Sequence, residues 1–139
     1  MAFAGINYIA VLIAAAAGWL AGAAWYMALA KPWMAAVGTS KEKIDQSRTQ
    51  PGASLPFVFA FAANVIMAWV LAGVVGHLGQ VTIRSGVISG ALCWLGFVIT
   101  TMLVNNSFAM RNRMLLLIDG GHWLLVLALM GAIIGAMGV

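Results

Sequence analysis

The sequence predicts an all-α integral membrane protein with four transmembrane helices in an up-down-up-down antiparallel bundle. Of its 139 residues, 64% are hydrophobic and 7% are charged, whereas soluble domains carry about 25% charged residues. The mean hydropathy is +1.04. The apolar residues gather in four long runs, and each run is long enough to cross a hydrocarbon core about 30 Å thick. We therefore expect one membrane domain over residues 1–139.

The first apolar run covers residues 7–30. Because no Lys or Arg precedes it, we expect a retained membrane helix rather than a cleaved signal peptide. Pro32 lacks an amide hydrogen, so we expect the helix to end beside it. Residues 31–54 then form a polar connection, and a short helix from Ser40 to about Arg48, with Ser40 as its N-cap, fits the pattern there.

Three further runs cover residues 55–78, 85–108 and 114–137. Pro56 suits the first turn of the second helix. The connections between these runs are short, which favours antiparallel packing of consecutive helices. Residues 64–73 also align with residues 122–131 at a constant offset, which raises the hypothesis of two duplicated hairpins related by an axis along the membrane normal.

The distribution of basic residues predicts the orientation of the chain in a bacterial cytoplasmic (inner) membrane. Six of the seven basic residues fall in the first and third connections, and only Arg84 falls in the second. By the positive-inside rule, the connection over residues 31–54 is cytoplasmic and both termini lie outside. The six are Lys31, Lys41, Lys43, Arg48, Arg111 and Arg113.

Glycines recur with the small-xxx-small spacing that lets membrane helices approach closely. Two interpretations stay open: packing inside one four-helix bundle, or association of protomers into a homo-oligomer. The glycine pairs are Gly18 with Gly22, Gly86 with Gly90, and Gly131 with Gly135.

Asp119 is the only acidic residue inside the four apolar runs. A charge in the hydrocarbon core costs a few kcal/mol, so Asp119 should face the bundle or a wet crevice. His122 lies one turn further along the same helix face. Pairing about the turn at 111–113 brings Thr101 to a similar depth, and Asn64 reaches the same level from the second helix. We therefore predict one intramembrane polar cluster of these four residues, which is either structural or a protonation or ligand site.

Several motifs of the chain resemble domain-of-unknown-function family 1761. The resemblance covers nearly the whole sequence, although the family usually has an aromatic residue where His122 stands. It implies a small bacterial four-helix membrane protein and implies no activity. The motifs lie at residues 22–26, 31–34, 66–72, 94–101, 118–122 and 130–135.

Three classes of function remain open from the sequence. The first is a structural or accessory protein that packs with itself or with a larger membrane complex. The second is a small transporter or channel subunit with a proton- or cation-binding site at Asp119. The third, an enzyme, is disfavoured because the sequence contains no HExxH, GxSxG or CxxC motif. We expect no cofactor, no metal site and no nucleic-acid partner, with the lipid bilayer as the surroundings.

Overall fold

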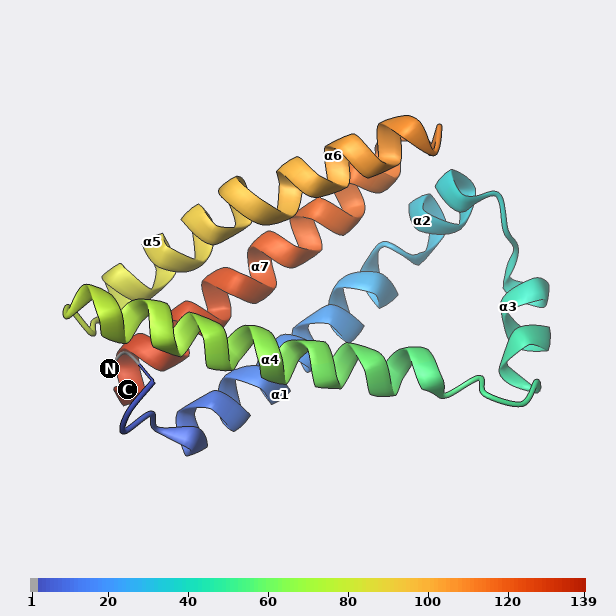
Figure 1. Ribbon diagram of the computed structural model, residues 1–139. Helices are drawn as coiled ribbons and strands as arrows, with labels where there is room; N and C mark the ends of the chain where they lie inside the picture. The colour runs from blue at the N-terminus through green and yellow to red at the C-terminus, as the bar shows by residue number, and fades with distance from the viewer. Residues whose placement is uncertain (1–2) are drawn as a thin grey trace.

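The computed structural model describes residues 3–139, and this part of the chain folds into helices joined by short connections (Figure 1). Four helical spans are long and apolar enough to cross a membrane, which confirms the predicted all-α class with four membrane-span helices. The third of these spans, Ile83–Phe108, contains a π-helical segment, η1, between α5 and α6. The elements are α1 (Tyr8–Ala28), α2 (Ala30–Val37), α3 (Lys41–Arg48), α4 (Leu55–Leu78), α5 (Ile83–Cys93), η1 (Trp94–Val98), α6 (Ile99–Phe108) and α7 (Arg113–Met137).

Polar side chains cap the start of four helices. Asn7 accepts a hydrogen bond from the amide of Ala10 at the start of α1, at 3.1 Å. Ser40 accepts from the amide of Lys43, at 3.3 Å, and this confirms the predicted cap and short helix. Thr82 and Asn112 cap α5 and α7 in the same way. These caps satisfy amide groups that have no partner inside the helix.

The polar connection contains one more helix than the sequence predicted. The helical conformation is interrupted at Leu29, between α1 and α2, three residues before Pro32. Pro32 lies in the first turn of α2, where its missing amide hydrogen costs no helical hydrogen bond. Gly38 ends α2 with a positive φ of 80°, a conformation that glycine adopts without steric cost.

Three pairs of contacting long helices run antiparallel. On α5 and α7, Gly86 faces Gly131 and Thr82 faces Gly135, so the numbering rises on one helix as it falls on the other. The pairs α1 with α7 and α1 with α4 follow the same rule. Figure 1 shows the two chain ends at the same end of the molecule, with α2 and α3 at the opposite end.

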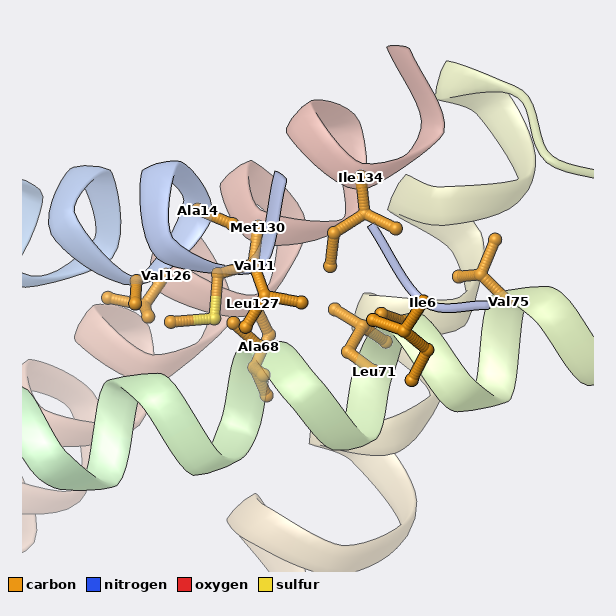
Figure 2. Close-up of a cluster of buried hydrophobic side chains, with 12 residues drawn as sticks. Ile6, Val11, Ala14, Ala68, Leu71, Val75, Val126, Leu127, Met130 and Ile134 are labelled. Carbon is orange, nitrogen blue, oxygen red and sulfur yellow. The ribbon is translucent and has the colours of Figure 1, made fainter. Parts of the chain in front are cut away.

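The apolar core lies between α1, α4 and α7. Figure 2 shows side chains from these three helices meeting there, together with Ile6 from the segment before α1. The Ile83–Phe108 span contributes least to the interior, because 11% of its most apolar stretch is buried, compared with 44% for α7. Met130, Ile134, Val75 and Val126 are the largest fully buried side chains.

All three predicted glycine pairs lie at contacts within this one chain. A Cβ added at Gly86 or Gly131 would collide with the backbone carbonyl oxygen of the other residue. A Cβ added at Gly90 would likewise collide with the carbonyl oxygen of Leu127, and one added at Gly135 would collide with that of Thr82. The remaining pair, Gly18 and Gly22, faces side chains of α4 and α7. These glycines therefore bring helices of the same bundle together.

The two helices of each hairpin, α1 with α4 and α5 with α7, pack against each other in different ways. In Figure 1, α5 lies along α7, whereas α1 and α4 cross. The first pair meets through glycine backbones, and the second meets through the contact of Gly18 with Asn64 and the edge-to-face rings of Trp19 and Phe61. This difference does not favour two duplicated hairpins, which would require the same crossing in both.

Candidate functional site

Asp119 is bound to α1 by a side-chain hydrogen bond. The Tyr26 hydroxyl donates to Asp119 Oδ1 at 2.6 Å, and both side chains are half-buried. Asp119 lies six residues after Arg113, the first residue of α7, about 9 Å along the helix at the standard rise. The acid therefore faces a neighbouring helix near one end of the bundle, where a hydroxyl group offsets the loss of water.

Two tryptophans bind α7 on either side of this residue. The Trp25 indole donates to the carbonyl oxygen of Ile118 at 3.0 Å, and the Trp94 indole donates to that of Gly120 at 2.8 Å. Three successive residues of α7 thus accept hydrogen bonds from side chains of α1 and η1. In lipid, where helices gain little from apolar association alone, such bonds and close packing hold neighbouring helices together.

The glycines beside Asp119 make room for side chains of neighbouring helices. A Cβ on Gly121 would lie 3.0 Å from the Trp25 ring, and one on Gly120 would lie 2.6 Å from Ile99 Cδ1. Both distances are shorter than ordinary van der Waals contact, so a larger residue would require the Trp25 ring or the Ile99 side chain to shift. The two glycines therefore let the Trp25 ring and the Ile99 side chain pack closely against α7.

His122 lies under the Tyr26 ring, one turn beyond Asp119. Its side chain is 7% exposed, and its ring centroid lies 4.9 Å from that of Tyr26 and 4.4 Å from that of Trp123. A Cβ on Gly22 would lie 2.7 Å from His122 Nε2. Among residues 3–139, Nδ1 has no hydrogen-bond partner although it is fully buried. An unpaired buried polar atom costs about 1–3 kcal/mol, which makes this nitrogen a candidate binding group.

Asn64 is the second buried polar side chain with an unpaired atom. It is 2% exposed, and its Nδ2 donates to the carbonyl oxygen of Ala60 at 2.8 Å. Its Oδ1 lies against Gly18 and has no donor within the described part of the chain. Gly18 and Gly22 are one turn apart on α1. Asn64 and His122 therefore lie against adjacent turns of the same helix.

Thr101 does not join these residues. Its side chain is exposed, and its hydroxyl lies 2.7 Å from the carbonyl oxygen of Phe97 and 2.9 Å from that of Val98, within its own span. The reason is η1, because a π-helical turn takes up one additional residue. That residue rotates the following positions by about 100° relative to a regular helix. Thr101, which was paired with Asp119 by depth alone, follows Trp94–Val98 and therefore faces a different direction from the one a regular helix would give.

The arrangement joins one carboxylate, one phenol and one imidazole across α1 and α7. These groups can hold helices together, and they can also hold a small hydrogen-bonding ligand or a cation. Within residues 3–139, no group of three or more His, Cys, Asp and Glu side chains is placed to hold a metal ion. Sequence reasoning did not find Tyr26, Trp25 or Trp94 as partners of α7, although all three are polar aromatic residues in otherwise apolar runs.

Comparison with known proteins agrees with the motifs of the sequence. No curated protein and no solved structure matches the chain. The model of a family described as a protein of unknown function, DUF1761, matches residues 9–135, which include all four apolar spans apart from the first residue of α1 and the last two of α7. On this match, which covers most of its length, the chain belongs to the DUF1761 family.

Proposed function

We propose that the chain is a multi-pass protein of the bacterial cytoplasmic membrane that acts as a structural or accessory component. In this proposal its four spans form an up-down-up-down transmembrane bundle with both termini outside. It works by packing, as a homo-oligomer or within a larger membrane complex, and it catalyses no reaction. The six basic residues in the first and third connections support the orientation.

One observation carries the structural proposal: residues 118–120 of α7 all accept hydrogen bonds from aromatic side chains of α1 and η1. The only acid of the four apolar runs is one of these three, bound to Tyr26. Polar side chains used in this way fix helices relative to one another. The outward apolar face of the Ile83–Phe108 span, which is the least buried, then remains for lipid or for a partner.

The size of the assembly tests this proposal. Purified from its own membranes in a mild detergent, the protein should give a fixed multiple of its 14.6 kDa chain mass, or one constant stoichiometric complex. Light scattering after size exclusion, with the detergent mass subtracted, measures this. A single 14.6 kDa chain that carries no partner at any detergent concentration contradicts the proposal.

A second candidate function rests on the unpaired buried atoms of Asn64 and His122. A transporter or channel subunit that binds a proton or cation at Asp119 would use such groups in the same region of the bundle. Asp119→Asn distinguishes the two candidates, because it keeps the side-chain shape and removes the charge. Lost folded yield with this variant supports the structural role. Unchanged folded yield, together with loss of the protein's effect in the cell, supports the binding site.

A further inference from the structure

The carboxyl group of Asp119 has few partners for an ionised acid. Its hydrogen bond within residues 3–139 comes from the Tyr26 hydroxyl, which donates to Oδ1 at 2.6 Å, and Oδ2 has no donor there. The ion pair of that part of the chain joins Asp45 with Arg48 on α3, so no basic side chain neutralises Asp119. An ionised carboxylate has room for about four hydrogen bonds, and buried charges are normally paired. The surroundings of Asp119 therefore suit a neutral acid better than an ion.

The groups next to Asp119 are hydrogen donors, and the carbonyl oxygens beside it are already in use. Those of the residues before and after it accept the indole N–H groups of Trp25 and Trp94. Hard cations take about six or more oxygen ligands. Across residues 3–139, three or more His, Cys, Asp and Glu side chains nowhere gather as a metal site. A metal ion at Asp119 would therefore lack ligands, whereas a proton needs a single oxygen atom.

His122 places a second unpaired polar group one turn further along α7. Its side chain is 7% exposed, and its buried Nδ1 has no hydrogen-bond partner in the described part of the chain. Tyr26 covers both groups, because its hydroxyl binds Asp119 while its ring centroid lies 4.9 Å from that of His122. A neutral acid has one O–H group to donate, and an uncharged imidazole has one nitrogen that accepts. Residues three apart share a helix face, so His122 offers an acceptor on the face where Asp119 would hold a proton.

The other titratable groups on the helices that pack against α7 do not bond to Asp119 within residues 3–139. Neither η1 nor α6 carries a titratable side chain. Asp119, Tyr26 and His122 are therefore the groups that determine whether a proton is held here. The others are Lys31 on α2, Cys93 on α5 and Arg113 at the start of α7, toward the same end of the bundle, and Tyr8 on α1, His77 on α4 and Arg84 on α5, toward the opposite end.

We propose that Asp119 is a proton-binding site inside the membrane. Its Oδ2 carries the proton, its Oδ1 accepts the hydrogen bond of Tyr26, and no metal cation binds there. A neutral acid avoids the free energy that an ionised side chain costs in hydrocarbon. The inference deepens the second candidate function, because it names the bound species, and it rests on the proposed membrane insertion. It requires neither transport nor a partner chain.

Reaction with dicyclohexylcarbodiimide tests for the proton. This apolar reagent enters membranes and detergent micelles and reacts with a protonated carboxyl group. The carboxyl oxygen adds to the central carbon of the N=C=N group, the proton passes to a nitrogen, and the adduct rearranges to a stable N-acylurea without a leaving group. With the purified protein in a mild detergent at near-neutral pH, we expect peptide mass spectrometry to locate the adduct at Asp119. The labelled fraction should fall as the pH is raised, because the carboxylate ion does not react.

The two remaining acids of the chain, Glu42 and Asp45, provide an internal control. Both are exposed on α3, so they should carry several-fold less adduct than Asp119 in the same sample. Acidifying the sample should label them, which verifies the reagent without a variant that has to fold. An unlabelled Asp119, or equal labelling of Asp45 and Asp119 at near-neutral pH, overturns the proposal.

Metal ions distinguish a bound proton from a bound cation. The labelling is repeated in sodium chloride, in potassium chloride and in N-methylglucamine chloride at the same pH and ionic strength. We expect equal labelling of Asp119 in all three, whereas protection by Na⁺ or K⁺ overturns the proposal and assigns the site to a metal cation. A reporter fused after Val139 measures membrane insertion, and the mass of the purified particle measures assembly. Failure of the labelling in an inserted chain therefore contradicts the proton site alone.

Discussion

The substitution Gly86→Ala should destabilise the bundle strongly, and Gly96→Ala in the same span should not. A Cβ at position 86 would collide with the carbonyl oxygen of Gly131, which is backbone and cannot move aside without moving α7. At Gly96, nothing lies within 4 Å of an added Cβ. The two variants therefore add the same methyl group to the same span, at Gly86 in α5 and at Gly96 in η1, and they differ chiefly in what this group meets.

The size of the effect follows from the length of the contact between α5 and α7. To accept the methyl group, the helices must separate by about 1 Å, a gap that loses up to half of the dispersion energy of each contact it opens. The close contacts at Gly90 and Gly135 belong to the same helix pair and open with it. Overpacking of this kind costs about 1–3 kcal/mol. Alanine recovers up to about 1 kcal/mol of helix propensity in α5, whereas at Gly96 the methyl group meets nothing within 4 Å, so Gly96→Ala should be close to neutral.

Thermal unfolding in a mild detergent, followed by tryptophan fluorescence, compares these variants with the parent protein. The expected order of stability is Gly96→Ala equal to or above the parent, and Gly86→Ala clearly below it. If Gly86→Ala unfolds at the same temperature as Gly96→Ala, the backbone contact between α5 and α7 is absent and the packing argument fails.

Three further predictions use the same parent protein. Tyr26→Phe should cost about 0.6–1.7 kcal/mol because Asp119 loses its donor, while Tyr8→Phe, at a tyrosine that is 61% exposed, should cost nothing measurable; equal effects in unfolding experiments would refute the bond. Asn64→Leu should change stability by less than about 1 kcal/mol, because the lost hydrogen bond from its Nδ2 to the Ala60 carbonyl oxygen is offset by removal of an amide oxygen that has no donor among residues 3–139; a loss above about 2 kcal/mol would contradict this balance. A reporter fused after Val139 that is active only outside the cytoplasm should give a signal, and a signal from a cytoplasm-only reporter would reverse the orientation.

The helical spans could be predicted because the bilayer requires long continuous apolar segments. The N-cap at Ser40 could also be predicted, because its hydroxyl can accept a hydrogen bond from an amide in the first helical turn. The π-helical segment η1 could not be predicted, because its residues, Trp94–Val98, fit a regular helix equally well by composition. That one segment decides which way Thr101 faces, so the wrong placement of Thr101 in the polar cluster followed from it.

The partner of Asp119 illustrates a second limit of the sequence. Short connections indicated contacts between consecutive helices, so Thr101 on the third span was placed beside Asp119, and Asn64 on the second span was added because it reaches the same level. Its bond goes to Tyr26 on α1, 93 positions away in the chain. Which non-consecutive helices meet depends on packing over the whole bundle, for which apolar periodicity carries little information in a membrane.

The position of α7 among its neighbours has a consequence for biogenesis. The helix that accepts hydrogen bonds from Trp25, Tyr26 and Trp94 follows all three donors in the chain. During synthesis these donors enter the membrane before their acceptors exist, so α1 and the third span cannot make their final contacts with α7 until that helix has been inserted. A chain truncated before Arg113 should therefore remain sensitive to protease. A chain that extends past Gly135 should become resistant in one step.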